Sequence, residues 1–159
     1  MTVEPNGTLC NCGNHGCLEQ YASGPAIRAA ALKAIAHGAT TILGEMVDYD
    51  LNKMTPEVVF NAALKGDEIA KNIYENAGYY LGIAIGNSIV QLEPERIVIG
   101  GGIAQAGEIL FAPMRRAIQE HVHLVPLERV QIVPAQLGNN AGVIGTSMWA
   151  EYMVRRKAL

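Results

Sequence analysis

The chain has 159 residues, of which 50% are hydrophobic and 17% are charged, and its formal net charge is -3. This length suits a single domain that buries a core without needing disulfides. The charge balance argues against a basic surface for nucleic acid and against an acidic disordered tail.

The first nine residues predict the end of a strand followed by a turn at Pro5-Asn6-Gly7. This segment contains neither a basic region nor an apolar one, so the sequence predicts no secretory signal.

All three cysteines of the chain follow within residues 10–17. Three thiols cannot all pair with one another, and their closeness favours metal ligands in a reducing, cytoplasmic protein over a disulfide framework. A structural zinc ion takes four ligands, and we predict that Cys10, Cys12 and Cys17 supply three of them. Small, buried, apolar thiols are the alternative. His15 is a candidate fourth ligand, although a residue inside so short a loop often points outward.

Helical signals dominate the chain from residue 18 to residue 91. After a short helix near residue 18, three longer helices are predicted, each preceded by a residue type that caps helix N-termini. They run from about Pro25 to Gly38, from Thr55 to Lys65, and from Asp67 to about Gln91. Residues 39–54 show no clear periodicity.

The third of these helices carries Gly78, Gly82 and Gly86 on one face, which lets a second element approach closely. A membrane span is the alternative for residues 77–92. We disfavour it because the apolar run is shorter than the roughly 20 residues that a span requires and contains Asn87. A buried central helix is the prediction.

Helices and strands alternate in the remainder of the chain. Arg96-Ile97-Val98-Ile99 predicts a strand buried on both faces, because it shows no polar alternation. The segments that follow are three glycines at 100–102, a helix over 106–122, a strand over 130–133 and a closing helix over 143–156. This order predicts a three-layer α/β architecture with ligands at the carboxyl ends of the strands.

The motif Cys-x-Cys-Gly-x-x-Gly-Cys-x-Glu at residues 10–19 resembles the signature of the ROK family of sugar kinases and sugar-responsive repressors. The stretches 21–24, 97–103 and 137–145 are also similar to that family, so the resemblance covers the whole chain. It implies an actin-like ATPase (ribonuclease H-like) fold of two lobes. In such kinases ATP phosphorylates a hexose hydroxyl with the help of magnesium, as in bacterial glucokinases, fructokinases and N-acetylmannosamine kinases.

On this basis, residues 1–159 are expected to form a single C-terminal lobe, an α/β unit of three layers with a helix-rich insert. The family also has a phosphate loop, Asp-x-Gly-Gly-Thr, and a catalytic aspartate, neither of which occurs among these residues. Its fourth zinc ligand is a histidine roughly ten residues before the first cysteine. We therefore expect the chain alone to show no turnover and to hold zinc weakly.

The resemblance assigns the three cysteines as zinc ligands and Glu19 as a carboxylate that accepts hydrogen bonds from sugar hydroxyls. Such charge-assisted hydrogen bonds are about twice as strong as neutral ones. An ordinary acid at a helix N-terminus is the alternative for Glu19.

Gly100, Gly101 and Gly102 match the family's adenosine-binding glycines, where the lack of side chains lets the backbone approach a nucleotide. A plain tight turn is the alternative. The glycine-containing stretch 138–142 could line the nucleotide site or only start the last helix, and we favour the structural role.

The leading function is an ATP-dependent hexose kinase of the glucokinase type, with this chain binding the hexose and the adenosine. The alternative is the sugar-sensing domain of a ROK-type repressor, which would carry a helix-turn-helix elsewhere. A fragment that folds without catalysis is a third possibility. The expected partners are a hexose, ATP and a second copy of the chain, with neither membrane nor nucleic acid.

Overall fold

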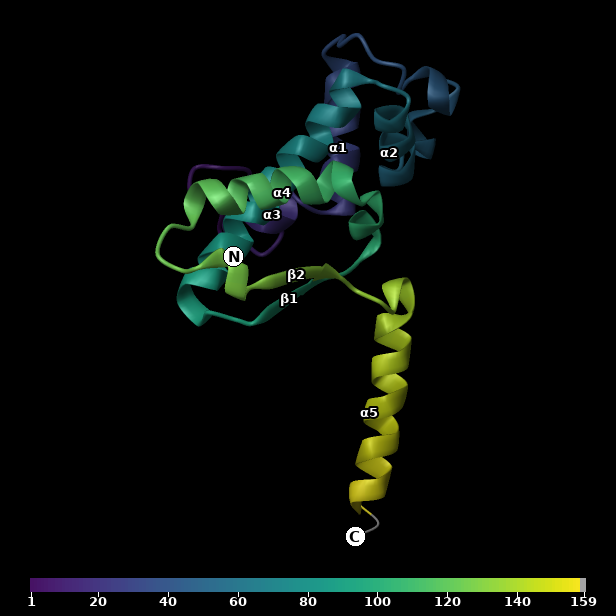
Figure 1. Cartoon of the computed structure of the whole chain (residues 1–159). Coiled ribbons are helices and arrows are strands. Elements are labelled where there is room, and N and C mark those ends of the chain that lie inside the picture. The colour runs from purple at the N-terminus through teal and green to yellow at the C-terminus, as the bar shows by residue number, and fades with distance from the viewer. Residues whose placement is uncertain (158–159) are drawn as a thin grey trace.

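The computed structural model describes residues 1–157, which form a mixture of helices and a small parallel sheet (Figure 1). The helices and strands are α1 Gly24–Ala36, α2 Pro56–Leu64, α3 Glu68–Leu92, β1 Arg96–Ile99, α4 Glu108–His121, β2 Gln131–Pro134 and α5 Ala141–Lys157. This is the predicted order of elements. The last two residues of the predicted lobe 1–159 lie outside the described part.

Helices α1, α2 and α3 begin where their capping residues predict. The side chain of Ser23 accepts a hydrogen bond from the backbone N–H of Ala26 at 3.2 Å. Thr55 and Asp67 do the same for the N–H groups three residues further on, at 3.3 and 2.8 Å. Each bond satisfies a donor that the first turn of a helix leaves free.

The aperiodic stretch 39–54 contains two single-turn 3-10 helices, Glu45–Val47 and Leu51–Lys53. It is nevertheless part of the core, because Leu43, Val47 and Met54 are buried. Turns this short are not long enough to produce a repeating pattern of apolar residues, which explains the lack of periodicity in this stretch.

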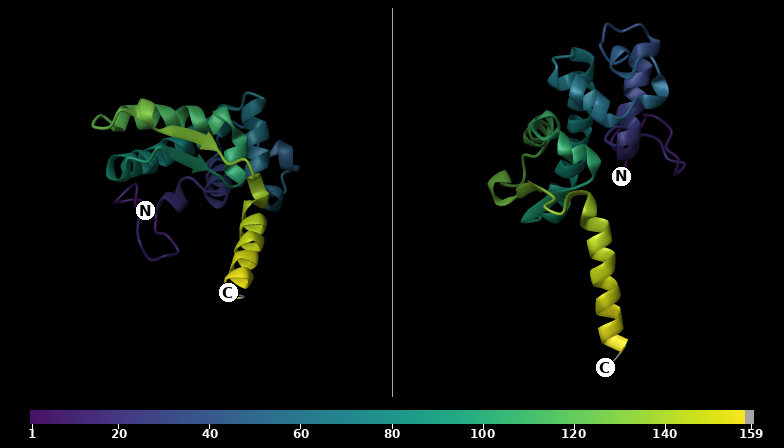
Figure 2. Two further views of the ribbon diagram at one scale, coloured as in Figure 1. Left: turned by 60° about the horizontal axis from the view of Figure 1, so that its bottom comes forward. Right: turned by 90° about the vertical axis from the view of Figure 1, so that its right-hand side faces the viewer.

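Helix α3 is the central element, as predicted. Its first half packs on α1 and α2, and α4 lies along its second half (Figure 2). A methyl group added at Gly78 would lie 2.6 Å from the carbonyl oxygen of Leu110, and one at Gly82 would lie 2.5 Å from that of Met114. The glycine face therefore admits the backbone of α4. None of the helices described over residues 1–157 combines the length and the apolar character that crossing a membrane demands.

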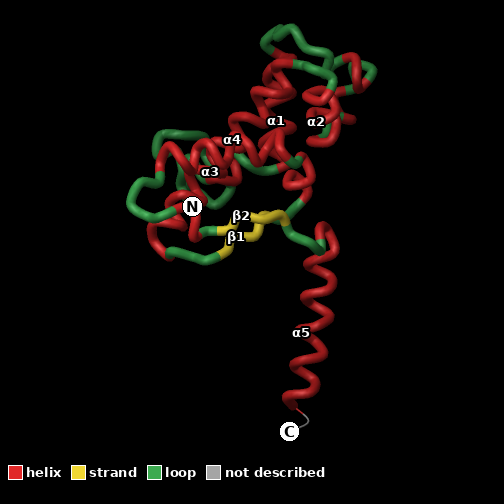
Figure 3. The backbone as a smooth tube through the Cα atoms, viewed as in Figure 1, coloured by secondary structure: helices red, strands yellow, loops and turns green. Residues whose placement is uncertain are grey.

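The strands β1 and β2 run parallel and side by side, with Ile97 opposite Ile132 (Figure 3). Ile97, Ile99 and Ile132 pack against the core formed by the helices. Val98 points the other way and is 57% exposed. The prediction of a strand buried on both faces was therefore wrong. Among the described residues, helices cover one side of the two strands, and α5 extends away from the other side (Figure 1).

Helix α4 begins two residues later than the sequence predicts. A 3-10 helix, Gly102–Ala106, precedes it, and Gly107 separates the two with a φ of 57°. The left-handed backbone at Gly107 interrupts what would otherwise be one continuous helix.

Candidate functional site

The three cysteines lie on a small hairpin that turns between residues 9 and 15. Leu9 pairs with His15 as an isolated antiparallel bridge. The backbone N–H of Cys10 donates to the carbonyl of Asn14 at 2.7 Å, and the N–H of Gly13 donates to the carbonyl of Cys10 at 2.9 Å. This turn brings Cys10 and Cys12 back toward Cys17. We call residues 10–17 the cysteine knuckle.

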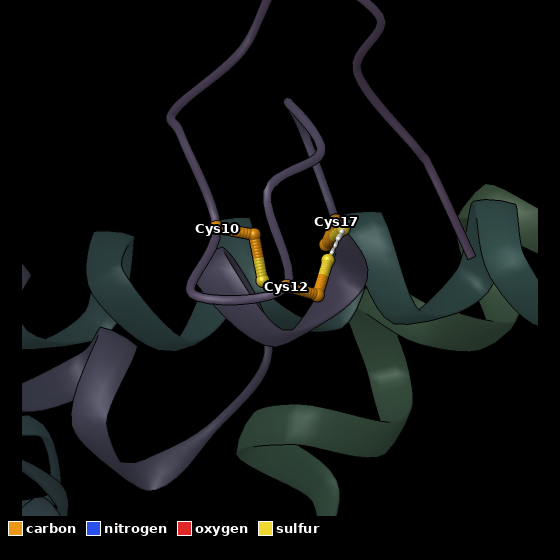
Figure 4. Close-up of side chains that lie close together, drawn as sticks. All are labelled: Cys10, Cys12 and Cys17. Carbon is orange, nitrogen blue, oxygen red and sulfur yellow. Dashed lines mark hydrogen bonds between the residues drawn. The ribbon is translucent and has the colours of Figure 1, made fainter.

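The three sulfur atoms of the knuckle converge on one point, as Figure 4 shows. All three Sγ atoms lie within 4.8 Å of one another, and those of Cys12 and Cys17 are 3.5 Å apart. Cys10 and Cys17 are buried, whereas Cys12 is exposed. Three soft thiolate donors with this spacing suit a structural metal ion such as zinc. The predicted clustering of the cysteines is confirmed.

Hydrogen bonds favour ionisation of one thiol within the cluster, that of Cys12. The N–H of Asn14 and the thiols of Cys17 and Cys10 hold the pKa of Cys12 below its ordinary value. The same hydrogen bond with Cys12 is the main reason why the pKa of Cys17 is raised to about 11. The Cys12 thiol therefore loses its proton more readily than the Cys17 thiol does.

The N-terminal segment locks the knuckle in place. Gly16 has a φ of 64°, and a methyl group there would lie 1.5 Å from the carbonyl oxygen of Glu4. The N–H of Val3 donates to the carbonyl of Gly16 at 2.8 Å. No other residue type fits at position 16 without moving this segment.

A pair of tyrosines ties the knuckle to the central helix. The hydroxyl of Tyr21 accepts a hydrogen bond from the N–H of Thr8 at 3.0 Å. The ring of Tyr21 lies 4.2 Å from the ring of Tyr80 on α3, measured between centroids. Sequence reasoning did not identify this contact, because the two tyrosines are far apart in the chain.

Glu19 lies at the edge of the knuckle, on the 3-10 helix Leu18–Gln20. The thiol of Cys10 donates to Oε2 of Glu19 at 3.8 Å. Glu19 is exposed, so its carboxylate is accessible to a solute while the knuckle fixes its position. Among the described residues, the group of potential metal ligands that converge consists of the three cysteines and does not include His15. Nδ1 of His15 lies 3.1 Å from the carbonyl oxygen of Gly7. The structure therefore gives no support for His15 as a fourth ligand.

The three glycines after β1 have different surroundings. Gly101 has a φ of 93°, which favours glycine whatever its neighbours. A methyl group at Gly100 would meet Cβ of Ala135 at 3.3 Å. At Gly102, φ is outside the left-handed region, and no neighbouring atom within the described residues lies within 4 Å of the added methyl. Neither the backbone nor the packing explains the absence of a side chain at position 102.

Gly102 opens onto a pocket of about 530 Å³ between the loop after β1 and the first turns of α2. The residues lining it are Gly24, Thr55, Pro56, Glu57, Phe60, Asn61, Tyr74, Gly102, Ile103, Gln105 and Ala106. Its volume falls in the range of roughly 300–1,000 Å³ that is usual for small-molecule sites. The contribution of α2 was missed at the sequence level. The only available signal was the spacing of Glu57, Phe60 and Asn61, which places them on one helix face.

A smaller hollow of about 150 Å³ lies at the carboxyl ends of both strands. Gly100, Gly101 and Gly138 line it together with Gln105. Gly138 has a φ of 51°, so a structural requirement for glycine holds there, as we expected for the stretch 138–142.

Comparisons with known proteins agree with this architecture. A family model described as ROK family matches residues 1–152. A glucokinase from Halalkalibacterium halodurans is 40% identical over 151 residues, which cover 91% of this chain and 44% of the glucokinase.

Two solved structures are similar in fold. A ROK family glucokinase from Streptomyces griseus, in complex with glucose and AMPPNP, has a TM-score of 0.79 and 28% identity, covering 91% of this chain and 47% of that one. A ROK family transcriptional regulator, described as a homologue of the E. coli MLC protein, has a TM-score of 0.74 and 34% identity, covering 84% of this chain and 33% of that one.

These similarities and the mixed helix and sheet architecture define an α/β protein with the actin-like ATPase fold of sugar kinases. The chain belongs to the ROK family. It spans less than half the length of each relative described above.

Proposed function

We propose that this chain is the sugar-binding and adenosine-binding C-terminal lobe of an ATP-dependent hexose kinase of the glucokinase type. The observation that carries the proposal is the contact between Glu19 and Cys10 at 3.8 Å, within a knuckle where three sulfurs converge. The knuckle fixes an exposed carboxylate, and a pyranose offers vicinal hydroxyls that donate well to such a group. The 40% identity to a glucokinase favours the same function.

Cys10, Cys12 and Cys17 would hold a structural zinc ion, which would brace the hairpin that carries Glu19. In this role the metal supplies rigidity and takes no part in phosphoryl transfer. In the complete protein, which would supply the fourth ligand, replacing Cys12 by Ser should loosen the hairpin and so weaken sugar binding through Glu19.

Gly100, Gly101 and Gly102 would accommodate the adenosine part of ATP. Gly102 is the most informative of the three, because neither its φ nor its contacts with the described residues explain why it lacks a side chain, and because it faces a pocket of suitable size. A glycine at such a position leaves room for close approach of a ligand.

Phosphoryl transfer would require the phosphate loop, the magnesium ion and the general base that the family supplies outside these residues. The 159 residues alone are therefore expected to bind hexose and nucleoside without phosphorylating glucose. A homodimer and a cytoplasmic location stay predictions.

Calorimetric titration of the purified chain with glucose tests the sugar site. Glu19→Gln should weaken glucose binding about tenfold or more, because the amide replaces a charged acceptor. Glu68→Gln is the matched control, since Glu68 is an exposed acid that pairs with Lys71 at 2.7 Å on α3. Equal glucose affinity for the Glu19→Gln and Glu68→Gln variants would remove the basis of the proposal.

A sugar-sensing domain of a ROK-type repressor is the second candidate, favoured by the similarity to the ROK family regulator at a TM-score of 0.74. A repressor needs the hexose site but not the nucleotide. Glucose binding by a chain that takes up neither adenosine nor ATP would favour the repressor over the kinase.

A further inference from the structure

Two sulfur atoms of the cysteine knuckle are in contact. Sγ of Cys12 lies 3.5 Å from Sγ of Cys17, and Figure 4 marks this contact with a dashed line. A disulfide bond is about 2.05 Å long, so the two atoms need to approach by only about 1.5 Å to become bonded. The pair is therefore placed for a covalent step as well as for metal binding.

The segment between these two cysteines leaves room for such an approach. It consists of four residues and begins with Gly13, whose φ is 88°. No neighbouring atom within the described part of the chain lies within 4 Å of a methyl group added at Gly13. The backbone directly after Cys12 can therefore shift without meeting a packed neighbour, while the contacts of Gly16 keep Cys17 in place.

The three cysteines differ in accessibility. Cys12 is exposed, so a small solute in water reaches its sulfur first. Cys17 is 7% exposed and Cys10 is 4% exposed. The thiol of Cys10 also donates to Oε2 of Glu19, away from the contact between the other two sulfurs. Exposure and contact together select Cys12 as the first thiol to react and Cys17 as its partner.

We propose that hydrogen peroxide oxidises the metal-free knuckle to a disulfide between Cys12 and Cys17, and that this disulfide and a bound metal ion exclude each other. The inference goes beyond the proposed binding of sugar and nucleotide. It assigns a second, redox-controlled state to the residues that would hold zinc.

The reaction has two steps. Sγ of Cys12 attacks one oxygen of hydrogen peroxide, the O–O bond breaks, and the leaving hydroxide takes the thiol proton as water, which leaves a sulfenic acid on Cys12. Sγ of Cys17 then attacks the sulfenic sulfur, the S–O bond breaks, and hydroxide leaves with the second thiol proton as water. Two thiols lose two electrons in total, and one peroxide is reduced to two molecules of water.

The disulfide removes two of the three metal ligands. Thiolates are the form of cysteine that binds metals, and a structural zinc ion takes four ligands. After oxidation the knuckle retains one thiol, that of Cys10. A bound metal ion occupies the sulfur lone pairs in turn, so it should protect the cysteines from peroxide.

Treatment of the reduced, metal-free 159-residue chain with hydrogen peroxide tests the covalent step. The number of free thiols should fall from three per chain to one, and the monomer should lose the mass of two hydrogen atoms. Peptide mapping should locate the bond between Cys12 and Cys17, and a dithiol reductant should restore all three thiols. A main product whose bond includes Cys10, a disulfide between two chains, or three unreacted thiols overturns the proposal.

Two serine variants form a matched pair. Cys17→Ser removes the partner and should slow disulfide formation at least about tenfold. Cys10→Ser keeps both partners and should react within about twofold of the rate of the unaltered chain. Equal rates for the two variants contradict the assignment. Circular dichroism will verify that both variants fold, and the mapping of the unaltered chain decides the pairing without them.

Cadmium ion is the probe for the exclusion between metal and disulfide, because thiolates prefer soft cations and cadmium thiolate bonds absorb ultraviolet light. The oxidised chain should bind Cd²⁺ at least about tenfold more weakly than the reduced chain, and a dithiol reductant should restore binding. A chain loaded with Cd²⁺ should lose its thiols to peroxide at least about tenfold more slowly. Equal affinity for Cd²⁺ before and after oxidation overturns the exclusion.

The failure of this inference can be distinguished from the failure of the proposed function. A chain that forms no disulfide between Cys12 and Cys17 overturns the inference and leaves the hexose site intact. A chain that forms the disulfide but binds no glucose supports the inference and removes the basis of the proposed function.

Discussion

Helices α3 and α5 are both long and rich in apolar residues, but their surroundings are opposite. Helix α3 lies in the middle of the core and contacts α1, α2 and α4. Helix α5 extends away from the rest of the molecule, and its main contact is with the 3-10 helix Gly138–Asn140 directly before it (Figures 1 and 2).

The glycines of the two helices show the same contrast, and the tryptophan of α5 is exposed. Gly78 and Gly82 of α3 meet the backbone of α4 at close range. By contrast, no other element in the described part of the chain comes within 4 Å of a methyl group added at Gly142 or Gly145 of α5. Trp149 on α5 is 63% exposed. An apolar helix can therefore be predicted from local sequence, but burial depends on whether another element offers a matching surface.

The largest difference should appear when a large side chain is removed from the core, where α4 packs on α3, and from α5. Leu110 of α4 is 0% exposed, so Leu110→Ala should lower the free energy of unfolding by about 3 kcal/mol. Trp149→Ala should change it by less than about 0.5 kcal/mol, because the indole has little packing to lose. Urea unfolding followed by far-ultraviolet circular dichroism measures both effects.

The single tryptophan of the chain provides a second measurement for this comparison. Its fluorescence in the unaltered chain should be typical of an indole in water and should change little while the core unfolds. A blue-shifted emission that follows the unfolding of the core would show that α5 is packed, contrary to the comparison.

The same substitution at two glycines should have effects of opposite sign. A methyl group at Gly82 would lie 2.6 Å from Cβ of Ala117, so Gly82→Ala should lower stability by about 2 kcal/mol through overpacking. Gly145→Ala adds a methyl to an open helix surface and should raise the stability of α5 by about 0.5–1 kcal/mol. Thermal unfolding of the two variants checks both signs, and a neutral Gly82→Ala would mean that α3 and α4 are not closely packed.

Much of the fold was predictable because its signals are local. The starts of three helices follow from Ser23, Thr55 and Asp67, whose side chains bond to their own helices within three residues. The gathering of the cysteines was predictable for the same reason, since residues 10–17 are close in sequence.

Features that depend on distant residues were not predictable. An apolar run such as Ile97-Val98-Ile99 does not say how many of its faces will be covered, and Val98 proves to be exposed. The α2 wall of the pocket was missed because Glu57 and Asn61 line a pocket only when the loop after β1 lies opposite them. The contact of Tyr21 with Tyr80 likewise exists only in the folded chain.

Asp67→Ala is expected to lower stability less than Leu110→Ala or Gly82→Ala, and it tests how the start of α3 is fixed. Its carboxylate accepts hydrogen bonds from the N–H groups of Ala70 and Ile42, both at 2.8 Å, and from the hydroxyl of Thr41 at 2.8 Å. Helix α5, by contrast, has no acidic residue in its first turn. Asp67→Ala should therefore destabilise the core by about 1 kcal/mol, the usual cost of losing an N-cap, without changing the helicity of α5.

The pH dependence of stability distinguishes the contribution of the charge on Asp67 from that of its capping hydrogen bonds. Partial burial acts to raise the pKa of Asp67, but the hydrogen bonds from Ala70, Ile42 and Thr41 outweigh it and hold the pKa below its ordinary value. A carboxyl with a lowered pKa in the folded state stabilises the protein above its unfolded pKa of about 3.9, and this stabilisation is lost as the pH falls further. Asp67→Asn keeps a side chain that can cap the helix but cannot ionise, so its stability should fall less steeply below about pH 4. Urea unfolding of both proteins from pH 7 to pH 3 measures the slopes, and identical slopes would show that Asp67 does not link the start of α3 to acid stability.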